Sequence, residues 1–242
     1  LLKMEGITKI YGNGFTANKD ITFTVNEGEI HALIGENGAG KTTLMKILFG
    51  LENCQQGKIY LDGKEVHIEN PLDAIAKGVG MVHQHFMLVP NLSVAENVVL
   101  GIEPGPGQIF DKKTAVRMTE EASEKFQLKV DPNALVRDIS VGLKQKVELL
   151  KALIRGAKVL ILDEPTAVLT PQEVRELFVQ LKSLKANGYG IIFISHKLDE
   201  VMELCDSATV LRHGRVTGFV KKEEMNELAL SRLIVGRDIV NT

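Results

Sequence analysis

The hydrophobic pattern of the first third of the chain predicts mainly strands. Residues 3–11 and 21–25 alternate apolar and polar positions around a Gly-Asn-Gly turn at 12–14. Residues 29–34 form a more continuous apolar strand, and an apolar helix is predicted to start at about Lys41. Three further elements are expected here: a strand at 57–63, a short helix capped by Asn70 with Pro71 in its first turn, and a buried strand at 78–82.

The pattern becomes helical from Ser93 onward. Ser93-Val94-Ala95-Glu96 is a capping box, residues 111–128 form an amphipathic helix, and Ser140 opens a helix that runs to about Ile154. The Gly- and Pro-rich stretch 102–108 predicts a loop. This block of helices interrupts an alternation of strands and helices. We therefore place a helical subdomain at 88–155, inserted into a core formed by residues 1–87 and 156–242.

The last third of the chain returns to alternating strands and helices. Two continuous apolar runs, 158–163 and 190–195, predict strands that are buried on both faces, as in a parallel sheet. Further elements expected here are a helix from Thr170 to about Asn187, a helix at 196–204, a hairpin at 208–218 and two short helices. The chain is thus predicted to be an α/β protein with a mostly parallel sheet, an antiparallel β-subdomain and an inserted helical subdomain.

Composition excludes several classes of protein. The chain has 242 residues, is 44% hydrophobic and has a formal net charge of −2, with no basic excess that would indicate nucleic-acid binding. Its two cysteines have no metal-ligand spacing and suit a reducing compartment. No apolar run reaches the roughly 18 residues of a membrane helix. The chain starts at Leu1 rather than Met, so we expect a fragment of a longer, soluble protein.

One segment has the pattern of a phosphate-binding loop, which is Gly, four residues, then Gly-Lys-Ser/Thr. It reads Gly35-Glu36-Asn37-Gly38-Ala39-Gly40-Lys41-Thr42-Thr43. Glycines allow successive backbone N–H groups to face an anion, and the N-terminus of the following helix adds positive potential. Lys41 would contact the β- and γ-phosphates, and the Thr42 hydroxyl would bind Mg²⁺. The alternative is a glycine-rich turn without a ligand.

A second candidate motif, Asp163-Glu164, follows a buried strand. An acidic residue at the C-terminal edge of a parallel strand lies beside the phosphate loop of a neighbouring strand. Asp163 can then hold Mg²⁺ through water, and Glu164 can orient or deprotonate the water that attacks the γ-phosphate. The fold would then be a phosphate-loop NTPase core. A merely polar strand end is the alternative interpretation.

These motifs occur in the order and approximate spacing of the ATPase domain of ABC transporters, which the chain resembles over essentially its whole length. The matching positions are Tyr11, residues 35–43, Gln84, Ser140-Val141-Gly142, Asp163-Glu164 and His196. The resemblance implies ATP and Mg²⁺ as cofactors. Tyr11 could stack on adenine, Gln84 could reach the metal or the attacking water, and His196 could donate to the γ-phosphate. Without the resemblance, Tyr11 would be interpreted as an aromatic residue of a strand, Gln84 as a solvated loop residue and His196 as a polar helix cap.

The segment Ile139-Ser140-Val141-Gly142-Leu143 resembles the family's signature segment, Leu-Ser-Gly-Gly-Gln, with two departures. In the family, its Ser and Gly complete the γ-phosphate site of another domain, so Ser140 and Gly142 are expected to act in trans. A third departure is Thr170, which stands where the family often has Asp.

The segments 140–142, 165–173 and 195–201 resemble the first half of tandem importer ATPases, which serve simple sugars and nucleosides. The segment 81–90 is most similar to the nucleoside group. The resemblance implies a second ATPase domain in a polypeptide of about twice this length, integral membrane permease subunits, and indirectly an extracytoplasmic solute-binding protein. The chain would lie on the cytoplasmic face of the membrane. Residues 86–89 are expected either to receive a helix of the membrane subunit or to pack in the core. A soluble ABC-type ATPase and a domain that occludes nucleotide with weak turnover remain as alternatives.

Overall fold

The central layer is a six-stranded sheet. The computed structural model describes residues 1–101 and 111–236. The strand order is β10-β9-β3-β8-β7-β6, and all neighbouring strands are parallel except β10 and β9. The strands are β3 (Ile30–Ile34), β6 (Val79–Val82), β7 (Val159–Asp163), β8 (Gly190–Ile194), β9 (Ser207–Arg212) and β10 (Arg215–Lys221). The predicted mostly parallel sheet is confirmed.

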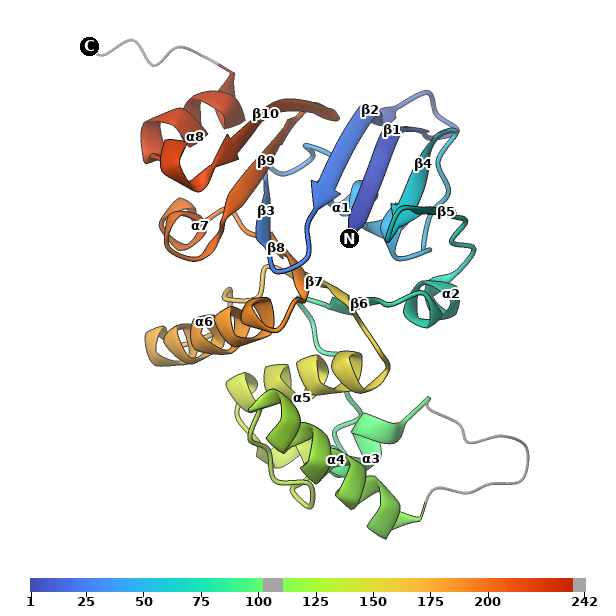
Figure 1. Ribbon diagram of the computed structural model, residues 1–242, viewed down its shortest axis with the longest axis vertical. Helices are drawn as coiled ribbons and strands as arrows, with labels where there is room; N and C mark the ends of the chain where they lie inside the picture. Colours follow the sequence, from blue (N-terminus) through green and yellow to red (C-terminus); the bar gives the residue numbers. More distant parts are fainter. Residues whose placement is uncertain (102–110, 237–242) are drawn as a thin grey trace.

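A four-stranded antiparallel sheet with the order β2-β1-β4-β5 lies beside it (Figure 1). Its strands are β1 (Leu2–Ile10), β2 (Thr16–Val25), β4 (Gln56–Leu61) and β5 (Lys64–Val66). Three of these were predicted, β1 and β2 from their alternation and β4 as the strand at 57–63. β5 was not, because its three residues are polar or only half-buried and carry no period. The Asp62-Gly63 turn, with positive φ at both residues, creates this strand by reversing the chain beside β4.

Helices cover the six-stranded sheet, and most lie where the sequence predicts them. They are α1 (Lys41–Leu48), α2 (Pro71–Ala76), α6 (Pro171–Ala186), α7 (Leu198–Leu204), α8 (Glu227–Val235) and a 3₁₀ turn at Lys222–Glu224. The prediction that a helix starts at 196 was wrong, because α7 begins two residues later. The Ser195 hydroxyl accepts a hydrogen bond from the Lys197 backbone N–H (3.0 Å), which favours a turn before the helix.

A block of helices lies at the end of the molecule away from the four-stranded sheet (Figure 1). It contains α3 (Val94–Val99), α4 (Lys112–Phe126), a 3₁₀ turn (Val136–Asp138) and α5 (Val141–Ile154). The side chains of Ser93, Asp111 and Ser140 cap the three α-helices, and the capping box at Ser93 is confirmed. The predicted loop at 102–108 lies outside the described residues. Within the described part of the chain, no helix is both long and apolar enough to cross a membrane.

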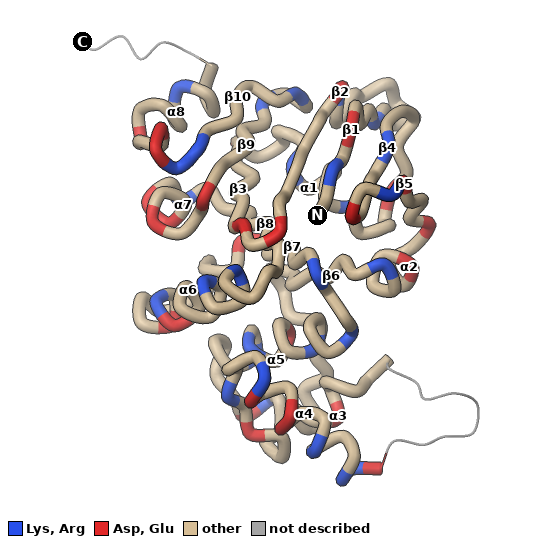
Figure 2. Tube along the Cα trace, viewed as in Figure 1, with Lys and Arg blue, Asp and Glu red and all other residues tan. Residues whose placement is uncertain are grey.

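Both faces of the parallel strands are buried. In β7, Leu160 and Leu162 join one apolar cluster, whereas Val159 and Ile161 join another on the opposite face. This explains why the strands read as continuous apolar runs. Because β3, β7 and β8 are parallel neighbours, the residues that follow them emerge at one edge of the sheet. Charges of both signs are interspersed over the remaining surface (Figure 2).

Candidate functional site

The phosphate loop leaves β3 and turns directly into α1. Gly40 is the N-cap of α1 with φ of 104°, and α1 has no side-chain cap. A Cβ at Gly40 would lie 2.6 Å from the Ala17 carbonyl oxygen, and one at Gly35 would lie 2.5 Å from that of Leu211. Glycine is therefore required at both positions. The first N–H groups of α1 lack side-chain acceptors, which makes this helix end a cradle for an anion.

Two neighbouring strands hold the loop in this shape. The Asn18 side-chain amide, on β2, donates to the Gly40 carbonyl oxygen (3.0 Å). The Gly214 backbone N–H, in the turn between β9 and β10, donates to the Ala39 carbonyl oxygen (3.0 Å). Sequence analysis missed both contacts. It placed Gly214 in a hairpin turn, but only the fold brings that turn to the phosphate loop.

Lys41 points into the loop. Its Nζ donates to the Gly35 carbonyl oxygen (2.6 Å), and the residue is only 8% exposed. Burial lowers the pKa of Lys41, while the charges of Glu164 and Asp163 oppose this effect. The phosphate loop and the Asp163-Glu164 motif are therefore close enough to interact, as their positions after parallel strands predict.

Asp163 and Glu164 end β7 beside the end of β8. Burial raises the pKa of Asp163, and the charge of Glu164 raises it further. Glu164 has φ of 45°, a left-handed conformation that is uncommon for a residue with a side chain. Its backbone N–H donates to the Ile194 carbonyl oxygen (3.0 Å), which fixes this conformation. His196 Nδ1 lies 3.0 Å from Glu164 Oε1, and the His196 side chain is 68% exposed. His196 is thus next to the carboxylate and open to a ligand.

The donor set fits Mg²⁺ held together with a nucleotide. Thr42 is an exposed hydroxyl in the first turn of α1, and Asp163 is a half-buried carboxylate at the neighbouring strand end. Among the described residues there is no cluster of three His, Cys, Asp or Glu side chains that could hold a metal alone. Mg²⁺ typically binds to one or two protein oxygens and takes its other ligands from phosphates and water.

The two remaining residues predicted to contact nucleotide, Tyr11 and Gln84, lie outside the phosphate loop. The Tyr11 hydroxyl lies 3.3 Å from Thr43 Oγ1 and donates to Glu52 Oε1 (3.2 Å), while Lys9 Nζ lies 5.3 Å from the Tyr11 ring centroid. Tyr11 is therefore anchored beside α1. Gln84 is exposed in the segment after β6. Stacking by Tyr11 and contacts of Gln84 with metal or water stay predictions.

The two signature residues lie at the N-terminus of α5. The Ser140 hydroxyl accepts a hydrogen bond from the Leu143 N–H of its own helix (3.2 Å). A Cβ at Gly142 would lie 2.1 Å from Glu173 Oε2, so the Glu173 carboxylate occupies the space beside Gly142. The backbone N–H of Thr170, and less strongly that of Gly142, lowers the pKa of Glu173. Gln145 Nε2 donates to the Pro165 carbonyl oxygen (2.6 Å), which ties α5 to the segment after Glu164. Sequence analysis missed Glu173 and Gln145.

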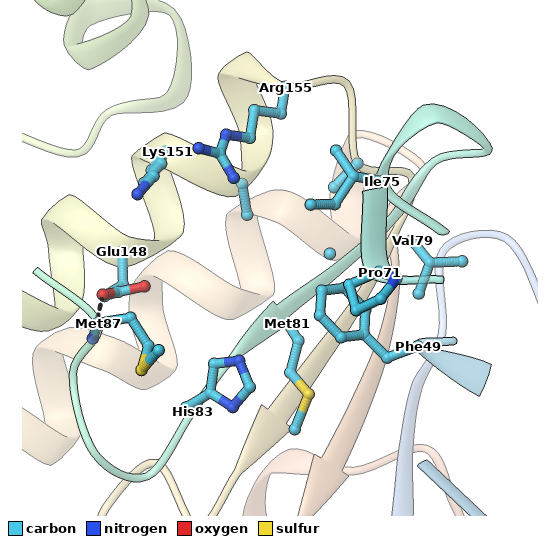
Figure 3. A pocket seen from close by; sticks show the side chains of 13 residues that line it. Phe49, Pro71, Ile75, Val79, Met81, His83, Met87, Glu148, Lys151 and Arg155 are labelled. Carbon is cyan, nitrogen blue, oxygen red and sulfur yellow. Dashed lines mark hydrogen bonds between the residues drawn. The ribbon is translucent and has the colours of Figure 1, made fainter. Parts of the chain in front are cut away.

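A cavity of about 190 Å³ separates the helical block from the edge strand β6 (Figure 3). One side is lined by Phe49, Ile75 and Met81. The other is lined by Glu148 and Lys151 of α5 and by Arg155 at its C-cap, with His83 and Met87 between the two sides. Of the predicted landing segment, Met87 is 66% exposed, whereas Leu88 packs against the core. Core packing therefore applies to Leu88, and binding of a membrane-subunit helix at this segment stays a prediction.

Comparisons with known proteins agree with this site. The sequence profile described as "ABC transporter" matches residues 18–167. Nucleoside import ATP-binding protein NupA of Lactococcus lactis subsp. cremoris is 48% identical over 99% of this chain and 47% of its own length. Guanosine import ATP-binding protein NupO of Bacillus subtilis is 47% identical over the same shares. The chain therefore spans about half the length of these curated relatives. The ADP conformation of MJ1267, an ATP-binding cassette of an ABC transporter, superposes with a TM-score of 0.85 at 25% identity, covering 98% of this chain and 99% of that one.

Proposed function

The chain belongs to the ABC transporter family, and from this premise we propose that it binds ATP with Mg²⁺ and hydrolyses it to drive uptake of a small solute. One observation carries the proposal. The phosphate loop, Asp163 with Glu164, and His196 all follow parallel neighbouring strands and meet at one edge of the sheet. This edge is where open α/β sheets bind nucleotides.

Each residue has a role that its position supports. Lys41 and the N-terminus of α1 hold the β- and γ-phosphates. Glu164 orients a water for attack on the γ-phosphorus and takes up its proton as the bond to the bridging oxygen breaks. His196 contacts the γ-phosphate and orients Glu164. Thr42 and Asp163 would hold Mg²⁺, with Gln84 as a further candidate ligand, and the metal would neutralise phosphate charge.

The site is completed by a second ATPase domain. Ser140 and Gly142 would serve the nucleotide of that domain, which we place in the same full-length polypeptide, because the curated relatives are about twice as long as this chain. Residues 88–155 would act as a helical subdomain between the core and the membrane. Permease subunits would insert a helix beside Met87, and an extracytoplasmic binding protein would act through them. With these partners, the chain would lie on the cytoplasmic face of the membrane.

The transported solute is a nucleoside or a simple sugar. The names of the two relatives at 48% and 47% identity specify nucleoside and guanosine import, whereas a ribose import ATP-binding protein of Escherichia coli O157:H7 is 40% identical. This order favours a nucleoside.

A Glu164→Gln variant of the full-length protein, assembled with its membrane subunits, tests the proposal. The amide cannot accept the proton, so steady-state ATP hydrolysis should fall by about 10²-fold or more, while ATP binding is retained. Lys197→Gln is a matched control beside His196 that should leave turnover near wild type. Equal hydrolysis by wild type and Glu164→Gln would show that this site is not catalytic.

A domain that occludes nucleotide with weak turnover is the second candidate, since Val141, Leu143 and Thr170 depart from the family pattern. Single-turnover measurements distinguish it. If wild type releases no phosphate from its bound ATP within the time of one transport cycle, occlusion is the correct function.

A further inference from the structure

The segment 83–89 connects the parallel sheet to the helical block, and it contains Gln84. β6 ends at Val82, paired with β7 in the sheet. From Met87 onward the chain is held by the helical block instead. The Met87 backbone N–H donates to Glu148 Oε1 on α5 (2.9 Å), and the Asn97 side chain on α3 bonds both the N–H and the carbonyl oxygen of Val89 (2.7 and 3.0 Å). Gln84 therefore lies on a short bridge between two bodies.

Glu148 on α5 makes the first hydrogen bond between segment 83–89 and the helical block. It is only 6% exposed, and burial raises its pKa. A carboxylate at such a position costs free energy unless it has partners. Its partners are the Met87 N–H and nearby groups that favour the carboxylate: Lys151 on α5, His83, and Arg155 at the C-cap of α5. An alanine or leucine would pack here without that cost, so packing alone does not explain a glutamate.

Glu148 also faces the cavity. Figure 3 shows the Glu148 carboxylate bonded to Met87, with His83 beside Met87 in the lining of the same cavity. The cavity lining therefore includes both Glu148 and Met87, and Met87 is three residues after Gln84 in the chain. Three residues span at most about 10 Å of extended chain, so Gln84 lies within about 10 Å of the point where Met87 is held, and only His85 and Phe86 separate the two residues.

We propose that Glu148 is a positioning residue: by holding the Met87 backbone it sets the position of Gln84, and so transmits occupancy of the cavity to the nucleotide site. The inference rests on the proposed function, since it assumes that a membrane-subunit helix enters the cavity and that Gln84 contributes to ATP turnover. It assigns the transmission to one carboxylate rather than to the apolar surface of the cavity.

The experiment uses the full-length protein with its membrane subunits in proteoliposomes, and measures solute-stimulated ATP hydrolysis and solute transported per ATP. Glu148→Gln keeps an oxygen acceptor for the Met87 N–H and should behave within about twofold of wild type. Glu148→Ala removes the acceptor and should lower solute stimulation about tenfold, the equivalent of one hydrogen bond to a charged acceptor.

A double-mutant cycle with Gln84→Ala separates positioning from simple structural support. If Glu148 acts through Gln84, the Glu148→Ala change should have little further effect in the Gln84→Ala background. Ile75→Ala is the matched control, because it changes the cavity wall on α2 without altering Glu148, its charged partners or the Met87 N–H. Its effect should add to that of Gln84→Ala.

The outcomes distinguish the two levels of the hypothesis. Additive effects of Glu148→Ala and Gln84→Ala, or a Glu148→Gln variant as impaired as Glu148→Ala, would overturn the positioning role and leave the proposed function intact. A Gln84→Ala variant with wild-type turnover, or a wild-type complex without solute-stimulated hydrolysis, would instead contradict the premise taken from the proposed function.

Discussion

The chain has two helix N-termini that are expected to face phosphate, and they are built differently. At α1, the N-cap is Gly40, no side chain caps the helix, and the first turn has no acidic residue. At α5, the Ser140 hydroxyl caps the helix, and the Glu173 carboxylate lies against Gly142. The first end leaves its donors for a ligand. The second already has acceptors from its own chain.

This difference matches the division of labour that we propose for a composite site. An open cradle with a lysine in it can bind phosphate within one domain. A capped helix end with a carboxylate beside it is stable without a ligand. The N-terminus of α5 would contact phosphate only when another domain presents a nucleotide. The Glu173 carboxylate would then have to move away from Gly142 or bind beside the phosphate.

The largest effect should come from Lys41→Met, which removes the only positive charge that residues 35–43 supply to the open end. The methionine fills similar space, and because Lys41 is buried the fold should tolerate the loss of charge. We expect ATP turnover to fall by about 10²-fold or more, as when one preorganised electrostatic contact is deleted.

Isothermal titration with Mg-ATP on the same Lys41→Met protein should show weakened binding. Lys46→Met, on the same helix but outside the loop, is the control and should bind as wild type does. If Lys41→Met bound and hydrolysed ATP normally, the contrast between the two helix ends would have no functional meaning.

Gly142→Ala probes the other helix end. Its φ is outside the left-handed region, so only the contact with Glu173 demands glycine, and the new Cβ would lie 2.1 Å from Glu173 Oε2. We expect turnover of the full-length protein to fall about tenfold, because the Glu173 carboxylate must move away from the new methyl group and disturb its bond to the Thr170 N–H and the surroundings of the trans donors. Gly142→Ala with Glu173→Ala should recover most of that loss. An equally impaired double variant would show that the glycine is needed for the approaching partner domain instead.

The sequence predicted where both helices begin, but not the contacts that join either helix end to distant segments, for a physical reason. The phosphate loop is a local object: its glycines, its lysine and the strand and helix around it are contiguous, so residues 35–43 could be interpreted directly. The contacts of Asn18, Gly214 and Glu173 join segments far apart in the chain, and no periodicity reports them. His196 shows the same limit. Its place after a buried strand was predicted, but its contact with Glu164 follows from the pairing of β7 with β8.

The smallest effect concerns the strand that supports the open end. Glu29 accepts hydrogen bonds from the Ser207 hydroxyl (2.5 Å) and pairs with His31 (2.8 Å), which joins the start of β3 to β9. Burial opposes ionisation of Glu29, but the hydrogen bonds from His31 and Ser207 outweigh it and lower its pKa from 4.5 to about 2. A depressed carboxylate pKa contributes stability that is complete above pH 4.5 and is lost as the pH falls towards 2.

Glu29→Gln should therefore lower the free energy of unfolding at pH 7 by about 1–2 kcal/mol, after allowing for the solvent contact of a side chain that is 13% exposed. The difference between the variant and wild type should shrink at pH 3, because wild type loses part of the same contribution there. Urea unfolding at both pH values measures this. Glu27→Gln, an exposed carboxylate two residues earlier, is the matched control and should show no such convergence. A Glu29→Gln difference that stays constant between pH 7 and pH 3 would mean that packing of β3, and not the ionised carboxylate, supports the loop.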